Sequence, residues 1–249
     1  MDGAEPGALR RALADIARIN PFFEVPALPA GQVRPLADLW RDPDYLDAQV
    51  AAVRARLAER ARIAPQRVEA RVAASLFFQG AAARLLSPAV ASVLCHGVLA
   101  DPDSLGWRTD AFGSLAPART GERADAVAPG GGAAALHRHV LTAVLDPMAG
   151  AVRARVPVAS RLLWGDAASA LAGAVQALAA ARPGAAEAAS RTGAELLAGP
   201  PLAGLGGPAE PGAGMAESFV RTTCCLYYRL PGFGKCGDCA LHGRRPAAT

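Results

Sequence analysis

Lysine, asparagine and aromatic residues are scarce in this chain of 249 residues. Lys235 is the only lysine, Asn20 is the only asparagine, and Phe, Trp and Tyr make up 5% of the residues. The net charge of +4 therefore rests on arginine, without a block of five or six basic residues or a nucleic-acid motif. We therefore expect no nucleic-acid partner. A mildly basic surface still favours anionic small molecules or acidic protein partners.

A secretory signal and a bilayer-spanning run are also missing. Residues 1–6 are acidic and are not followed by an apolar region. The longest apolar stretch, around Ala167–Ala181, is rich in alanine and carries Gln176, so it is too short and too weakly apolar to span a bilayer. We expect a soluble cytoplasmic protein, where clustered cysteines more often bind metals or carry redox chemistry than form disulfides.

Alanine and helical periodicity are abundant, and 52% of the residues are apolar. This composition predicts a mainly α fold with a small β-hairpin component. Two Asp-Pro pairs, at Asp42 and Asp146, have the form of a helix N-cap followed by proline. The periodicity predicts helices at Gly7–Ile19, Pro43–Arg62, Pro65–Ser87, Pro88–Leu99, Ala133–Leu145, Pro147–Val156, Arg161–Ala181 and Ala185–Leu197, with short strands within Leu105–Val127 and a β-type segment at Glu217–Tyr228.

Glycine and proline divide the chain. Ten of the sixteen residues from Gly199 to Gly214 are glycine or proline, which predicts a linker. We therefore expect a helical body over residues 1–198, a linker over 199–214 and a C-terminal cysteine segment over 215–243 that closes over the body. Gly204-Leu205-Gly206-Gly207 lacks the strand, helix and acidic residue of a nucleotide loop, so we expect no bound NAD, FAD or ATP.

Four of the five cysteines, Cys224, Cys225, Cys236 and Cys239, lie within sixteen residues. Four thiolates are a complete ligand set for one centre, and they select zinc, Cu(I) or an iron–sulfur cluster. Adjacent residues of a regular strand point to opposite faces, so the first pair can serve one centre only if the backbone kinks. Structural zinc sites prefer a gap of two to four residues within each pair. The spacing therefore favours [2Fe–2S] over a zinc knuckle or disulfides, which stay as alternatives.

Several other residues are weaker candidates. His137 and His139 are two apart on a helix and do not share a face, so a solvated surface is the simpler interpretation. Cys95 is interpreted as a buried thiol in an apolar helix, and His242 as a donor beside the cysteines or a rare ligand. Trp164 is expected to form a wall against which the cysteine segment packs. Asp166 is interpreted as a possible helix N-cap.

The run Arg221-Thr-Thr-Cys-Cys-Leu-Tyr-Tyr-Arg-Leu-Pro-Gly-Phe-Gly-Lys-Cys-Gly-Asp-Cys239 closely resembles the C-terminal signature of the FhuF-like ferric-siderophore reductases. A second stretch, residues 161–170, also resembles that family, with aspartate at position 166 where the family leads us to expect asparagine. The resemblance implies that the four cysteines hold a [2Fe–2S] cluster. It implies no catalytic side chain beyond that cluster.

The implied function is one-electron, outer-sphere reduction of a ferric siderophore, with release of Fe(II). A hydroxamate siderophore is the family-level expectation. The electron donor is a separate partner, such as a ferredoxin, a flavin reductase or reduced flavin. Basic and aromatic residues beside the cysteines are expected to steer substrate or donor: Arg221, Tyr228, Arg229 and Lys235, with Arg244 and Arg245 beyond. Two alternatives stay open, a structural zinc site and an iron–sulfur electron carrier of siderophore metabolism.

Overall fold

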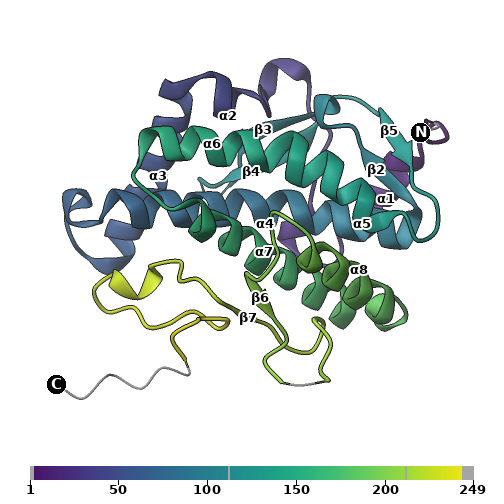
Figure 1. Ribbon diagram of the computed structural model, residues 1–249. Coiled ribbons are helices and arrows are strands. Elements are labelled where there is room, and N and C mark those ends of the chain that lie inside the picture. The colour runs from purple at the N-terminus through teal and green to yellow at the C-terminus, as the bar shows by residue number, and fades with distance from the viewer. Residues whose placement is uncertain (1–2, 112, 211, 243–249) are drawn as a thin grey trace.

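The computed structural model describes residues 3–111, 113–210 and 212–242 (Figure 1). Helices dominate, and the strands form only small sheets of two or three members, which confirms the expected mainly α class. The longer helices are α1 (Ala8–Ile16), α3 (Pro43–Ala61), α4 (Ala70–His96), α6 (Asp146–Arg155), α7 (Ser160–Ala181) and α8 (Ala186–Ala198), with shorter α2 (Asp38–Arg41) and α5 (Gly132–Leu136).

Helices α4 and α7 form the centre of the molecule and pack along each other (Figure 1). By length and composition both could cross a membrane, so the expectation that the stretch around Ala167–Ala181 is too short and too weakly apolar is wrong, because α7 begins earlier, at Ser160. However, 72% of the most apolar stretch of α4 and 67% of that of α7 are buried inside the protein. Core helices of soluble proteins share this character. Phe78 of α4 meets Trp164 of α7 edge to face, with ring centroids 6.4 Å apart, so Trp164 packs in the core between these two helices.

Two expected helix breaks are wrong. Pro88 lies inside α4, which runs unbroken to His96. A proline inside a helix costs ~3 kcal/mol or more, but both faces of α4 are buried here, and this packing outweighs the local preference. Asp146 starts no separate helix either, because α5 continues through the π-helix η5 (His137–Leu145) into α6 without interruption. By contrast, Asp42 caps α3 as predicted, and its carboxylate accepts a hydrogen bond from the Tyr45 N–H.

The strands are short and antiparallel. β3 (Leu105–Thr109) lies between β1 (Arg34–Pro35) and β4 (Leu115–Arg119), with Trp107 opposite Pro117, and β2 (Val98–Ala100) pairs with β5 (Ala124–Ala126). Figure 1 shows both sheets above α4, on the side opposite the C-terminal segment, with β2 and β5 toward the far end of the helix. A third pair joins β6 (Gly206–Gly207) to β7 (Val220–Arg221), so most of the β-type segment Glu217–Tyr228 is irregular rather than strand.

The C-terminal segment is held to the body by two sets of apolar contacts. Leu202 and Leu205 of the glycine- and proline-rich connection are buried in the main core. Beyond β7, Leu230 joins a second, smaller core with Leu57 and Val68, from the end of α3 and the turn before α4. Figure 1 shows the segment (yellow) beneath this α3–α4 turn. The segment is thereby fixed against α3, α4 and α7.

Candidate metal centre

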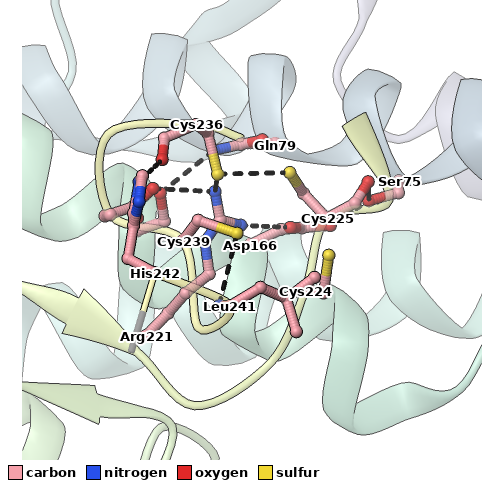
Figure 2. A network of polar contacts seen from close by, with 12 residues as sticks. Ser75, Gln79, Asp166, Arg221, Cys224, Cys225, Cys236, Cys239, Leu241 and His242 are labelled. Atoms are coloured by element: carbon pink, nitrogen blue, oxygen red, sulfur yellow. Dashed lines mark hydrogen bonds and ion pairs between the residues drawn. The ribbon is translucent and has the colours of Figure 1, made fainter. Parts of the chain in front are cut away.

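The cysteines lie on two consecutive loops that begin where β7 ends. Cys224 and Cys225 follow that strand, and Leu226 then takes the left-handed conformation (φ 66°) before the short 3-10 helix η7 (Tyr227–Arg229). This is the irregular backbone that an adjacent cysteine pair needs to serve one centre. Cys236 and Cys239 follow the turn at Pro231–Gly234. Figure 2 shows the four side chains around the Arg221 guanidinium.

Two of the thiols are already at the spacing of ligands. Cys225 Sγ and Cys236 Sγ are 3.6 Å apart. Two thiolates on one tetrahedral metal, each at about 2.3 Å from it, are separated by about 3.8 Å. Within residues 3–111, 113–210 and 212–242, no three His, Cys, Asp or Glu side chains are close enough to hold a single metal ion. Cys225 and Cys236, one thiol from each loop, therefore stand as two thiolate ligands of one metal would.

Backbone and side-chain donors are directed at the sulfur atoms. The Leu226 N–H donates to Cys224 Sγ (3.3 Å) and the Leu241 N–H to Cys239 Sγ (3.5 Å). Arg221 Nη2 donates to Cys236 Sγ (3.2 Å). Donors aimed at sulfur stabilise the thiolate form that binds metal, and at iron–sulfur clusters they also tune the reduction potential. This set of donors fits a thiolate-bound cluster.

Arg221 is the organising cation of the site. Its side chain is fully buried, Nη1 donates to Asp166 Oδ1 (2.8 Å), and Nη2 donates to Asp238 Oδ1 (2.9 Å) as well as to Cys236 Sγ. A buried guanidinium needs such partners because its desolvation costs several kcal/mol. The expectation that Arg221 steers a partner from the surface is therefore wrong. The residue positions the cysteine loop instead.

Asp166 lies in the middle of α7, not at a helix N-terminus, so the N-cap interpretation is wrong. Its carboxyl group is fully buried, and Oδ2 is 2.7 Å from the hydroxyl of Ser75 on α4. The same hydroxyl is 3.0 Å from the carbonyl oxygen of Cys225. Sequence reasoning missed Ser75, because one serine in an apolar helix carries no signal until the fold brings α4, α7 and the cysteine loop together.

Ser75 has one hydroxyl hydrogen and two neighbouring acceptors when Asp166 is ionised. A protonated Asp166 removes the conflict, because it donates to Ser75 Oγ while Ser75 donates to the Cys225 carbonyl. Burial raises the pKa of Asp166 to about 7, against the opposing influences of the Ser75 hydrogen bond and the Arg221 charge. An asparagine at this position would donate in the same way at every pH.

The paired thiols differ in acidity. The hydrogen bond with Cys236 lowers the pKa of Cys225, and Arg221 and the backbone N–H of Tyr227 lower it further. The same bond with Cys225 raises the pKa of Cys236. Cys225 is therefore the first of the pair to become a thiolate, ready to bind a metal.

The remaining predicted residues lie around this centre. The side chains of Tyr228, Arg229 and Lys235 are exposed, and Arg229 pairs with Glu69 (2.6 Å). His242 contacts the backbone, with Nε2 2.7 Å from the carbonyl oxygen of Cys236. Arg244 and Arg245 lie outside the described residues.

The weaker candidates lie away from the cysteines. Cys95 is partly buried, and burial raises its pKa. His137 and His139 are not simply solvated, since they contact the Pro200 carbonyl (3.0 Å) and the Asp125 carboxylate (3.3 Å).

Comparison with known proteins identifies this segment. The family model described as the FhuF 2Fe-2S C-terminal domain matches residues 221–241, which include all four clustered cysteines and Arg221. No curated protein matches the chain. The match confirms the resemblance expected from the sequence, and it agrees with the donor set described above. The chain therefore carries a FhuF-type C-terminal domain, whose cofactor is a [2Fe–2S] cluster.

Proposed function

We propose that this protein is a cytoplasmic ferric-siderophore reductase. The observation that carries the proposal is the match of residues 221–241 to the FhuF 2Fe-2S domain, together with a cysteine loop that stands at the protein surface. Cys225 and Cys239 are buried, whereas Cys224 and Cys236 are partly exposed. A centre held in this way is shielded on the side of the body and open toward solvent, as outer-sphere electron exchange requires.

The chemistry needs one electron for each iron released. A siderophore binds Fe(III) tightly through hard oxygen ligands and binds Fe(II) far less tightly, so reduction of the substrate iron is enough to free it. The cofactor supplies electrons one at a time. The protein holds the four thiolates, excludes water from the side of α4 and α7, and sets the charge around the sulfur atoms through Arg221. No proton-transferring side chain is needed.

Space for a chelate lies beside the second cysteine loop. A pocket of about 550 Å³ is bounded by α7 and by the loop, with Gln176, Ser218 and Asp238 among its polar lining residues. Gly237, between the two cysteines of this loop, also lines it. This lining carries no arginine or lysine, which suits an uncharged or cationic complex. Three hydroxamates, each with one negative charge, neutralise Fe(III), so the charge of a ferric hydroxamate chelate is compatible with this lining.

The first test is anaerobic purification with quantification of iron, sulfide and zinc. We expect about two irons and two sulfides per chain, visible charge-transfer absorption and an EPR signal on reduction. The pre-reduced protein should then convert ferric hydroxamate chelates to Fe(II), followed with a ferrous-specific dye. Cys236→Ser should remove both the absorption and the turnover, while Cys95→Ser, the matched control outside the cysteine loops, should change neither.

Two other results would each favour an alternative. One zinc per chain, without sulfide or colour, would contradict the reductase and indicate a structural tail. A fully loaded protein that is reduced and reoxidised, but that reduces no ferric chelate, would indicate an electron carrier of siderophore metabolism.

A further inference from the structure

The charge of this chain is concentrated next to the cysteine segment. Residues 54–71, which form the end of α3, the α3–α4 turn and the start of α4, contain six arginines and two glutamates. The whole chain, by comparison, carries only +4. We define the basic patch as the exposed cations of this stretch and of the cysteine segment: Arg60, Arg62, Arg67, Arg71, Arg229 and Lys235.

The basic patch is continuous with the cysteine segment. Glu69 joins its two parts, because Oε2 accepts from Arg71 Nε (2.7 Å) and Oε1 accepts from Arg229 Nε (2.6 Å). Below these charges, Leu57 and Val68 pack with Leu230 in the second core. Figure 1 shows the two parts side by side. A molecule bound on the patch therefore rests on the segment that holds the cysteines.

An exposed aromatic side chain adds to these charges. Tyr228 is 42% exposed, and among the described residues only it and Phe22 are large hydrophobic side chains with such exposure. Tyr228 lies three residues after Cys225. The neighbouring Tyr227 turns inward, where its ring packs edge to face on Phe233 at 5.1 Å. Arginine and tyrosine are the residues enriched at protein–protein contacts, so this composition favours a protein partner.

The arginines are not arranged to enclose a small anion. A pocket of about 290 Å³ lies beside Tyr227 and is lined by Arg56, Arg60 and Arg84. Arg56, however, donates to the Gly113 carbonyl (2.6 Å), and Arg84 is paired with Asp110 (2.7 Å). Some cations of the patch, such as Arg60 and Arg67, have no ion-pair partner among the described residues. Their side chains are exposed on the surface. The charge therefore suits a broad acidic surface better than a buried ligand.

We propose that the basic patch is the docking surface for an acidic electron-donor protein, which reaches the cofactor from the side of Tyr228. This inference rests on the proposed function, and it separates two sides of the cysteine segment. The donor uses the arginine-rich side at α3 and α4, and the ferric chelate uses the pocket at Gly237 and Asp238, whose lining carries no arginine or lysine. Docking on one side leaves the other free, so both partners can be bound together.

The test compares two double charge reversals in the cofactor-loaded protein. Arg60→Glu with Arg67→Glu changes the patch. Arg153→Glu with Arg191→Glu makes the same change in net charge on exposed helix surfaces elsewhere. The probe is a reduced, acidic [2Fe–2S] ferredoxin, and the readout is the stopped-flow rate of reduction of the cofactor at several ionic strengths. Reduction by photoreduced lumiflavin, an uncharged small donor, measures the intrinsic reactivity of each variant.

We expect the patch variant to lose about tenfold or more of the ferredoxin rate at low salt, and most of its salt dependence, because steering raises association rates by that order. The control variant should change by less than about twofold, and lumiflavin should reduce all three proteins alike. Equal losses in both variants, or no loss in either, would overturn the proposal.

A second arm separates this proposal from the proposed function. Reduction of an anionic tris-catecholate ferric chelate by each pre-reduced variant is measured alongside. Slower chelate reduction with an unchanged ferredoxin rate would assign the patch to substrate and overturn the docking proposal. If none of the proteins reduces any chelate, the reductase function fails, whereas the ferredoxin rates still decide the docking surface.

Discussion

Arg221 Nη1 lies 2.8 Å from Asp166 Oδ1, and both side chains are completely buried. The two residues come from β7 and α7, 55 positions apart in the sequence. Arg221 Nη2 donates to Cys236 Sγ, so a single side chain connects the buried carboxyl group to a predicted ligand. This pair joins the conformation of the cysteine loop to the helical core.

Removal of Arg221 should destabilise the protein strongly. Arg221→Ala leaves Asp166 buried and without its ion-pair partner, which costs about 3–5 kcal/mol of the free energy of unfolding. Arg221→Lys keeps the charge but cannot make three directed bonds, so it should fall between alanine and wild type. The matched control is Arg229→Ala, which breaks a partly exposed pair with Glu69 and should cost less than about 1 kcal/mol. Urea unfolding measures all three, and equal costs for Arg221 and Arg229 would contradict the positioning role.

Asp166→Asn should make the cofactor easier to reduce near neutral pH and above. The amide retains the shape of the side chain, but it no longer offsets the Arg221 charge beside Cys236. Positive charge near a cluster raises its potential. A rise of about 60 mV corresponds to a tenfold change in a one-electron equilibrium and is the order we expect. EPR-monitored redox titration gives the value, and Asp47→Asn, at an exposed pair with Arg155, should leave it unchanged.

The stability of the metal-free, reduced protein should depend on the protonation of Asp166. Its pKa is raised from 3.8 to about 7, so the folded state holds the proton more tightly than the unfolded chain does. This contribution is fully present below pH 3.8 and is lost as the pH rises through about 7. The loss should approach about 1.4 kcal/mol per pH unit within that window. In Asp166→Asn the contribution is absent, so the difference in urea midpoint between the two proteins should change with pH. A constant difference from pH 4 to pH 8 would argue against a raised pKa.

Gly165 and Gly173 provide a matched pair within α7. A Cβ added at Gly165 would stand 1.8 Å from Thr223 Oγ1, in the residue before Cys224, whereas a Cβ at Gly173 meets nothing within 4 Å. Gly165→Ala should therefore displace the cysteine loop and lower the iron content of the purified protein. Gly173→Ala should leave the iron content unchanged and add about 0.5–1 kcal/mol of stability, because alanine favours the helix. Equal iron content in both variants would show that the loop tolerates the shift.

The sequence alone determined what depends on local order along the chain. The alanine-rich periodicity predicted most of the helices, and Asp42-Pro43 marked the start of α3, because capping acts between neighbouring residues. The spacing of Cys224, Cys225, Cys236 and Cys239 favoured a [2Fe–2S] cluster over zinc, and the resemblance of this run to the family signature implied that cofactor. A chelating motif within sixteen residues needs little help from the rest of the fold.

The tertiary structure decided what depends on burial. Pro88 remains within α4, because the packing of both faces of the helix outweighs the tendency of proline to end a helix. Arg221 appears from its position to be a surface cation, and Asp166 to be a cap. They become a buried pair only when α7 and β7 are brought together. Ser75 joins them from α4, 91 residues before Asp166. The charges and hydrogen bonds around the sulfur atoms could therefore not be predicted from the sequence, since desolvation is a property of the folded state.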